Sequence, residues 1–306
     1  MLNYLMVILS DDSVSYCHYH SCNKGNGLMP IDLLQKGILF AMKNDLGIHL
    51  IYPETPLPQE YEPIIKSFKN AKIKPCSASG QADIVVVNGV KELEICSFTK
   101  SVICRIDKNS LLANQNALCK CFNQFERTNL VITDIESFKQ EDFDRYKDFL
   151  LLILQTVDIE KHKVNILTDR LEIDSMNNCN AGVNNITLAP DGKFYICPGF
   201  YFSDDCESVG DIDTGLDIKN KQLFQIEYAP ICCHCDAFHC KRCIWLNQKT
   251  TLEVNTPSHE QCVISHLERN ATKDWLTQRT DDKYNDIKIN ELSYLDPFDE
   301  HKNWNL

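Results

Sequence analysis

Short apolar runs alternate with amphipathic segments along the first half of the chain. The apolar runs are rich in β-branched residues, as strands buried on both faces of a sheet are. They predict strands at residues 4–9, 48–52, 72–75, 83–87, 102–106, 130–133 and 164–167. Apolar residues spaced three and four apart predict helices that begin at Pro30, near Tyr61, near a cap at Asn109-Ser110 and near Gln140. This alternation predicts an α/β fold with a parallel sheet, open or partly closed into a barrel.

The pattern changes after residue 172, where Asn, Asp, Gly and Cys become frequent. Two alternating runs, 185–189 and 193–196, flank Pro190-Asp191-Gly192 and predict a β-hairpin. We therefore predict an α/β domain over residues 1–175 and a small cysteine-rich domain over residues 176–270. The last segment, 271–306, is acidic and polar, and we expect it to form a tail or a strap.

Length and charge limit the classes of function. A chain of 306 residues is long enough for two domains, and its net charge of −12 with no basic stripe argues against a nucleic-acid partner. The apolar start lacks a basic region before it, so it is interpreted as a strand and not as a signal peptide. The longest internal apolar run, 149–154, is far shorter than the ~20 residues of a membrane span. We therefore expect a cytoplasmic protein without a membrane partner, in a compartment where disulfides rarely persist.

Nine of the 16 cysteines lie between residues 179 and 262. Cys232-x2-Cys235 and Cys240-x2-Cys243 are two chelating pairs, because two intervening residues let both sulfurs face one metal centre. Zinc sites with four cysteines usually separate such pairs by about fifteen or more residues, whereas only four residues separate these two. Iron–sulfur clusters are larger than an ion and tolerate close ligand spacing. The spacing favours clusters, with zinc as the alternative, and the nearby His234, His239 and His266 are interpreted as structural.

The order of these cysteines resembles that of the SPASM domain family. The pattern is a first cysteine, a Gly-x4-Cys stretch, Cys-x2-Cys, two further cysteines and a distant last one: Cys179, Gly192 with Cys197, Cys232 with Cys235, Cys240 with Cys243, and Cys262. The intervals after Cys235 are four and two residues, where the family usually has five and three. SPASM domains hold auxiliary [4Fe–4S] clusters and are appended to radical S-adenosylmethionine enzymes that modify peptides.

This resemblance implies two [4Fe–4S] clusters and assigns their ligands. The second cluster would be held by Cys232, Cys235, Cys240 and Cys262. The first would be held by Cys179, Cys197 and Cys243. Its fourth ligand has no counterpart at the usual position, so Cys206 and Cys233 are candidates, with an open iron as the other interpretation.

The first half departs from the radical enzymes at two motifs. Their Cys-x3-Cys-x2-Cys loop is replaced after the first strand by Cys17-His18-Tyr19-His20-Ser21-Cys22, and their Gly-Gly-Glu stretch by Tyr52-Pro53-Glu54-Thr55-Pro56. Both departures argue against ordinary radical chemistry and leave S-adenosylmethionine binding doubtful. Four residues of the replaced loop are candidates for a further metal site, with a redox pair or a loop without a site as alternatives: Cys17, His18, His20 and Cys22.

The whole chain resembles the CXXX repeat peptide maturase family, through residues 13–19, residues 36–43 and the SPASM-like cysteines. This implies a degenerate radical-SAM-like α/β region followed by a SPASM-like domain, and a cysteine-containing precursor peptide as partner. We expect an iron–sulfur protein that acts in the maturation of a ribosomally synthesised peptide, directly or as accessory subunit to a separate radical enzyme. The alternative is a non-catalytic peptide-binding module or a zinc-stabilised interaction module. The sequence identifies no catalytic residue.

Overall fold

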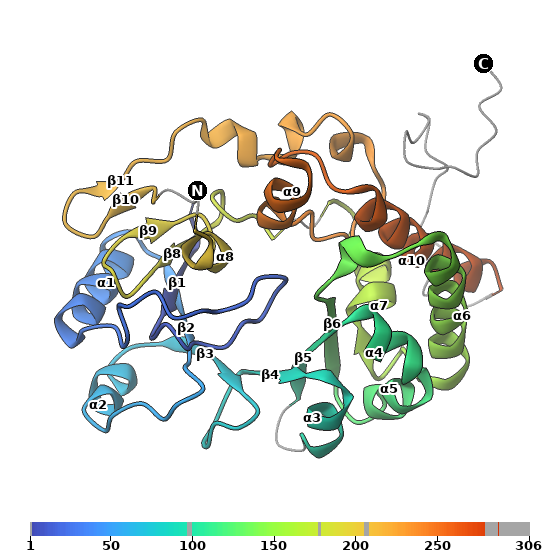
Figure 1. The fold of residues 1–306 in the computed structure, drawn as a ribbon, viewed down its shortest axis with the longest axis horizontal. Coiled ribbons are helices and arrows are strands. Elements are labelled where there is room, and N and C mark those ends of the chain that lie inside the picture. The colour runs from blue at the N-terminus through green and yellow to red at the C-terminus, as the bar shows by residue number, and fades with distance from the viewer. Residues whose placement is uncertain (1, 97–99, 177–178, 205–207, 279–286, 288–306) are drawn as a thin grey trace. The chain divides into compact units, whose positions relative to one another are not determined.

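The computed structural model describes residues 2–96, 100–176, 179–204, 208–278 and 287. Contacts within the chain divide it into two compact units. The first unit is Met1–Arg105 with Asn180–Gln225, and the second is Ile106–Cys179 with Ile226–Leu306. Each unit therefore combines two separate stretches of the chain (Figure 1). The predicted domains, 1–175, 176–270 and 271–306, follow a different division and stay predictions.

A mainly parallel sheet forms the centre of the first unit. Its strand order is β5-β4-β3-β2-β1-β8-β9, in which β9 alone is antiparallel to its neighbour. The strands are β1 (Tyr4–Ile8), β2 (Gly47–Ile51), β3 (Asn70–Pro75), β4 (Ile84–Asn88), β5 (Ser101–Ile106), β8 (Asn185–Leu188) and β9 (Phe194–Tyr195). β1 pairs with β2 on one side and with β8 on the other, and most of its side chains are buried. This central position explains why its sequence is an almost continuous apolar run.

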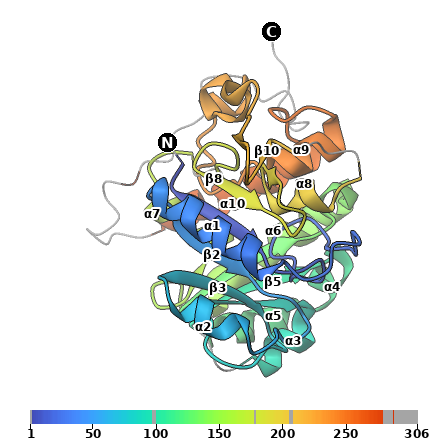
Figure 2. The ribbon, with the colours of Figure 1, turned by 90° about the vertical axis from the view of Figure 1, so that its left-hand side faces the viewer.

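Helices connect the strands of the first unit. They are α1 (Ile31–Lys43), α2 (Tyr61–Lys66), α3 (Gly89–Ile95), α8 (Pro198–Phe202) and the 3-10 turn η2 (Lys221–Phe224), beside a small ribbon of β10 (Gly210–Asp211) and β11 (Gly215–Leu216). α1 packs on β1 and β2 (Figure 2). Gly37 makes this packing close, because a Cβ there would lie 2.6 Å from Cδ2 of Leu188 on β8. The β8–β9 hairpin turns at Gly192, whose φ of +82° favours glycine.

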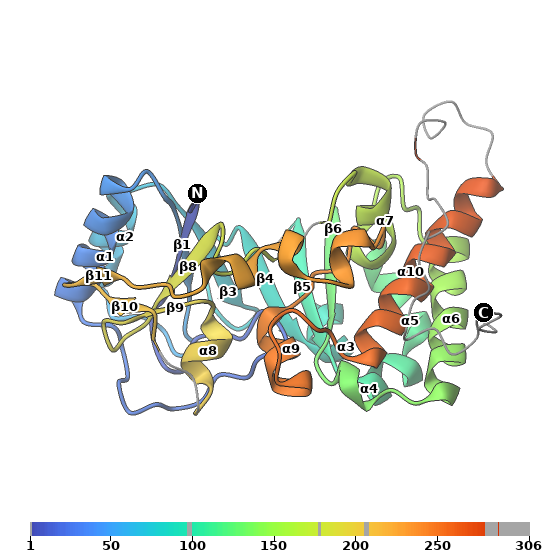
Figure 3. The same ribbon diagram turned by 90° about the horizontal axis from the view of Figure 1, so that it is seen from above.

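The second unit is largely helical. It contains two paired parallel strands, β6 (Arg127–Ile132) and β7 (Lys163–Val164). Its helices are α4 (Lys108–Ala113), α5 (Gln115–Phe122), α6 (Gln140–Thr156), α7 (Asn165–Glu172), α9 (Ile244–Thr251) and α10 (His259–Thr277), with 3-10 turns η1 (Ile135–Ser137), η3 (Ile226–Tyr228) and η4 (Cys232–His234). α10 lies along α6 and α7 (Figure 3). Through these contacts α10 packs the segment after residue 226 against helices formed by residues 140–172.

The predicted α/β class with a parallel sheet is confirmed, and the β8–β9 hairpin lies where it was expected. The predicted strand at 164–167 is wrong after Val164, where α7 begins. At this point the side chain of Asn165 pairs with the backbone of Leu130, in place of a strand-to-strand backbone pairing. Its Oδ1 accepts from the N–H of Leu130 at 2.7 Å, and its Nδ2 donates to the Leu130 carbonyl at 3.2 Å. Residues 271–277 belong to α10 and Gln278 is its C-cap, and the remainder of the predicted strap lies outside the described residues, apart from residue 287.

The helix predicted to be capped at Asn109-Ser110 begins before that position, at Lys108. Asp107 is the cap, since its Oδ1 accepts from the N–H of Ser110 at 2.9 Å. Asp107 takes the N-cap position in place of Asn109 or Ser110 because its short carboxylate side chain reaches the first unpaired amides of α4. The predicted single helix is divided at Asn114 into α4 and α5.

Candidate metal centre

Four cysteines line one cavity in the second unit. They are the residues predicted to ligate the second cluster: Cys232, Cys235, Cys240 and Cys262. The cavity is narrow, with a volume of about 20 Å³, and it is partly open to solvent. Met176, Ile231, Ala237, Pro257 and Ser265 supply much of the rest of its wall. Residues that are 30 positions apart in the sequence are thus gathered around one space.

Tight turns and a helix start place these sulfurs. In η4 the N–H of Cys235 donates to the carbonyl of Cys232 at 3.2 Å, and further along the N–H of Cys240 donates to the carbonyl of Ala237 at 2.9 Å. Cys262 lies in the first turn of α10, where its N–H donates to the carbonyl of the N-cap Ser258 at 3.2 Å. The x2 spacing of the first pair therefore folds as a turn, as a chelating pair requires.

Two thiols of this cavity, those of Cys232 and Cys240, have a raised pKa that favours their protonated form. Burial, together with the neighbouring Cys240, raises the pKa of Cys232 to about 12. Burial also raises the pKa of Cys240, although hydrogen bonds from the Ser265 side chain and the backbone of Arg242 oppose the shift. Metals bind thiolates, so loading of this cavity would release protons and replace the burial penalty by metal–sulfur bonds.

A buried arginine lines the same cavity. Arg242 is 1% exposed, and its Nη1 donates to Oδ1 of Asn255 at 2.9 Å. Burial lowers the pKa of Arg242, and the thiol groups of Cys232 and then Cys179 are the first to oppose this effect. A guanidinium in the interior is stabilised when anions lie close to it. The cavity therefore combines four sulfurs with a cation that favours their thiolate form.

The ligands predicted for the first cluster are only partly brought together. The N–H of Cys179 donates to the carbonyl of Lys241 at 3.1 Å, which places Cys179 beside the segment that leads to buried Cys243. Cys197 belongs to the first unit, where it is the N-cap residue of α8. Cys233 is exposed, and Cys206 lies outside the described residues. The ligand set of the first cluster stays a prediction.

The sulfurs do not converge on the position of a single ion. Within the described ranges, no three side chains of His, Cys, Asp or Glu are placed to hold one metal ion together. Cys235 has other neighbours instead: its Sγ lies 3.4 Å from Nε2 of His266 and accepts from the N–H of Ala237 at 3.4 Å. His266 is thus in direct contact with a predicted ligand, although no sequence pattern favours it over the other histidines.

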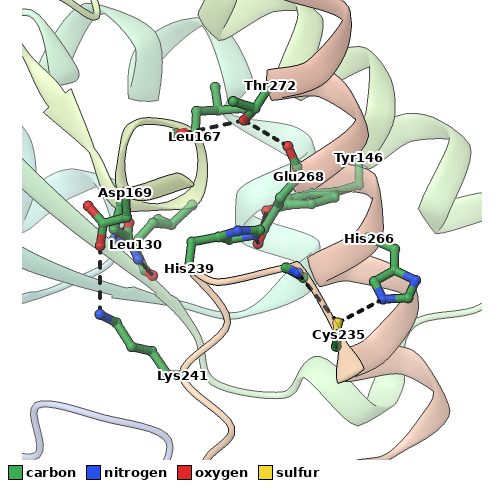
Figure 4. A network of polar contacts seen from close by, with 12 residues as sticks. Leu130, Tyr146, Leu167, Asp169, Cys235, His239, Lys241, His266, Glu268 and Thr272 are labelled. Atoms are coloured by element: carbon green, nitrogen blue, oxygen red, sulfur yellow. Dashed lines mark hydrogen bonds and ion pairs between the residues drawn. The ribbon is translucent and has the colours of Figure 1, made fainter. Parts of the chain in front are cut away.

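A buried polar network holds the segment between Cys235 and Cys240. Glu268 of α10 lies between Tyr146 of α6 and His239 (Figure 4). The hydroxyl of Tyr146 donates to Oε1 of Glu268 at 2.6 Å, and Nε2 of His239 lies 3.0 Å from Oε2. Burial and the Glu268 charge raise the pKa of Tyr146, which stays a hydrogen-bond donor. The sequence analysis did not identify this role of Glu268. A carboxylate on the buried face of α10, near Ile264 and Ala271, is a signal for a buried polar contact of this kind.

The loop from Cys17 to Cys22 lies in the first unit, and Arg105 holds it in place. Nε of Arg105 donates to the carbonyl of Cys17 at 2.8 Å, and Nη2 donates to that of Tyr19 at 2.8 Å. Nη2 also lies 3.5 Å from Nδ1 of His20. The Cys22 thiol donates to the carbonyl of Phe202 at 3.4 Å. The four candidate ligands of this loop, Cys17, His18, His20 and Cys22, therefore stay a prediction as a metal or redox site.

Comparisons with known proteins add a likeness of fold. No protein-family model and no curated protein matches the sequence. Among solved structures, the chain is similar to the crystal structure of Streptococcus suis SuiB bound to S-adenosylmethionine. The TM-score is 0.42 and the identity 10%, over 76% of this chain and 68% of that chain. At these values the likeness identifies neither a family nor an activity for this chain. In its described part, no helix has the length and apolar character needed to cross a membrane.

Proposed function

We propose that this chain is an iron–sulfur protein that acts in the maturation of a ribosomally synthesised, cysteine-rich peptide. It acts either directly or as the accessory subunit of a separate radical S-adenosylmethionine enzyme, in the cytoplasm. The strongest support is the single cavity lined by Cys232, Cys235, Cys240 and Cys262 beside buried Arg242. These four residues are the ones that the SPASM-like spacing selects as ligands of the second cluster, and their shared cavity supports the proposal.

In this proposal the close spacing of the cysteines favours a cluster over one zinc ion, which is the alternative. Zinc binds all four sulfurs at about 2.3 Å from one centre, whereas a cubane cluster binds each sulfur through a different iron and needs them further apart. The described residues offer a shared cavity without a single-ion position. When bound, a cluster there would supply electron storage and transfer at a potential set by burial and nearby hydrogen bonds. The first predicted cluster, on Cys179, Cys197 and Cys243, belongs to the same proposal.

The absence of the Cys-x3-Cys-x2-Cys motif favours the accessory role over independent radical chemistry. In that role, this chain would hold the precursor peptide or exchange electrons with the partner enzyme. The cysteine-containing peptide and the radical partner are both part of the proposal.

The test is metal content after purification and reconstitution without oxygen. We expect about eight irons with matching acid-labile sulfide per chain, that is two cubane clusters. Replacing either Cys235 or Cys240 by Ala should remove about four of these irons. Cys76→Ala is the matched control, because that cysteine belongs to the first unit and is not among the residues that line this cavity, so the variant should keep all the iron. Full iron content in Cys235→Ala would contradict the assigned ligands.

A second measurement separates maturation from simple binding. The reconstituted chain is incubated with a cysteine-containing precursor peptide, a reductant and S-adenosylmethionine, with and without a radical partner enzyme. A mass change in the peptide supports maturation. Peptide binding without any mass change supports the non-catalytic module, and about one or two zinc ions without sulfide support the zinc-stabilised alternative.

A further inference from the structure

Two neighbouring hollows lie in the first unit, at the carboxyl ends of β1, β2 and β3. The first hollow, of about 580 Å³, lies between the segments that follow β1 and β2. The second, of about 570 Å³, lies between the segments that follow β2 and β3. They share one wall of the chain, formed by Pro53, Glu54, Thr55, Pro56 and Pro58. Parallel sheets bind their ligands at this edge, so one ligand could span both hollows.

The second hollow contains a buried ammonium group. Lys74 of β3 is 9% exposed; its Nζ donates to the carbonyl of Ser79 at 2.9 Å and lies 4.7 Å from the centre of the Tyr52 ring. Burial, with the charge of Lys72, lowers the pKa of Lys74. None of the ion pairs found among the described residues includes Lys74. Its charge is thus held by a carbonyl and an aromatic face alone.

The loop after β3 closes around this ammonium group. Gly80 has a φ of +80°, and a Cβ built on it would lie 3.6 Å from Nζ of Lys74. A buried ammonium without a carboxylate costs stability. Lys66 and Lys72 also line the second hollow and add positive charge, against the carboxylates of Glu62 and of Glu54 on the shared wall. An anionic ligand, and a carboxylate in particular, would complete the environment of Lys74.

The first hollow has the opposite charge. Three of its lining residues are carboxylates, Asp11, Asp12 and Glu54, and none of its lining residues is Lys, Arg or His. Asp11 fixes the wall, because its Oδ2 accepts from the N–H groups of Asn26 at 2.8 Å and Gly27 at 2.9 Å. Burial, then the charges of nearby carboxylates, raise the pKa of Glu54 against a hydrogen bond from Ser77. A cation bound in this hollow would relieve that repulsion.

We propose that the two hollows together bind an extended peptide segment that carries a basic side chain and a carboxylate. The basic side chain occupies the first hollow, beside Asp12 and Glu54, and the carboxylate pairs with Lys74 in the second. The identification of the ligand as a peptide rests on the proposed function. The opposite charges of the two hollows do not depend on it.

Binding of short labelled peptides, measured by fluorescence anisotropy on the reconstituted protein, tests this site. The probes are glycine–serine peptides with amidated ends that contain one lysine and one glutamate at increasing separations. In matched probes, glutamine replaces the glutamate or the lysine. We expect the best dipolar probe to bind about tenfold more tightly than either matched probe.

Variants assign each end of the probe to its hollow. In Lys74→Met the preference for glutamate over glutamine should disappear while the preference for lysine remains. In the double variant Asp12→Asn with Glu54→Gln, the preference for lysine should disappear while the preference for glutamate remains. Asp213→Asn is the matched control, since it removes an exposed carboxylate of the same unit and should change neither preference. Equal glutamate preference in the native protein and in Lys74→Met would overturn the proposal.

Two further readings separate this proposal from its alternatives. The unfolding midpoint of Lys74→Met should be equal to or above the native value, because the variant removes a buried charge; a large fall would show that Lys74 is structural. Free lysine and glutamate that compete as well as the linked probe would overturn the peptide ligand. Iron content is measured on every sample. If a sample with full iron content does not prefer the probe that carries both lysine and glutamate, this binding site is contradicted and the cluster proposal is not. If a sample without iron still prefers that probe, only the cluster proposal is contradicted.

Discussion

The hydroxyl of Tyr146 is the most direct test of the buried network beside the candidate metal centre. It donates to Oε1 of Glu268 at 2.6 Å, while His239 lies 3.0 Å from the other carboxylate oxygen. Tyr146 is 0% exposed and Glu268 is 6% exposed, so water does not readily replace a lost partner. Tyr146→Phe removes the donor and changes little else.

The expected effect follows from the charge of the acceptor. A buried hydrogen bond to an ionised group contributes about 1.5–3 kcal/mol, so Tyr146→Phe should lower the free energy of unfolding by about 2 kcal/mol. Urea unfolding followed by tryptophan fluorescence measures it, because all three tryptophans belong to the second unit: Trp245, Trp275 and Trp304. The midpoint should fall without a change in the slope of free energy against urea.

Tyr228→Phe is the matched control, since it deletes the same hydroxyl in the same unit at a residue that is 55% exposed. It should change the free energy of unfolding by less than about 0.5 kcal/mol. If Tyr146→Phe costs no more than this control, Glu268 is not held by Tyr146 and the reasoning about the network is refuted.

Three further outcomes are expected. Gly37→Ala should destabilise the protein by about 1–3 kcal/mol in thermal or urea unfolding, because the added Cβ would lie 2.6 Å from Leu188, although alanine favours a helix. Burial raises the pKa of Asp142, but the hydrogen bond and charge of its lysine partner outweigh burial and hold that pKa below 3.8. The stability that this ion pair contributes is therefore present at neutral pH and is lost as the pH falls through the lowered pKa, so the melting temperatures of the native protein and Asp142→Asn should converge below pH ~4. Finally, iodoacetamide should modify exposed Cys22 quickly; Cys119, whose thiol pKa is raised by burial, should react only after unfolding, as mass spectrometry of the peptides would show.

The sequence predicted the sheet of the first unit well because its strands are buried on both faces. Five predicted strands match β1 to β5 within a few residues, and a sixth matches β6 of the second unit. The failure at Asn165 has a different origin. Its amide side chain pairs with the backbone of Leu130, and a contact over 35 positions leaves no periodic signal in the local sequence.

The candidate metal centre likewise has parts that could be predicted from the sequence and parts that could not. Two-residue spacing predicted that Cys232 and Cys235 would face a common space, because a short turn fixes their separation. The contribution of Arg242 to that space could not be predicted, since an arginine between two cysteines has the same local pattern whether it is buried or exposed. Glu268 and His239 meet through the packing of α10, which was not predicted from the sequence at all.

Buried charges in this chain separate structural pairs from candidate sites. Lys108 pairs with Asp142 at 2.7 Å and Arg127 pairs with Asp169 at 2.6 Å, so each of these cations has its anion within the fold. Arg242 has thiols and then Glu227 as the groups that favour its charge, and Lys74 has a carbonyl and an aromatic ring. Ionisation of the thiols would strengthen the first environment, and an anion from outside the chain would complete the second. Metal loading would ionise the thiols around Arg242, and a ligand carboxylate would serve Lys74. The same physical requirement therefore supports the metal centre in one unit and the peptide site in the other.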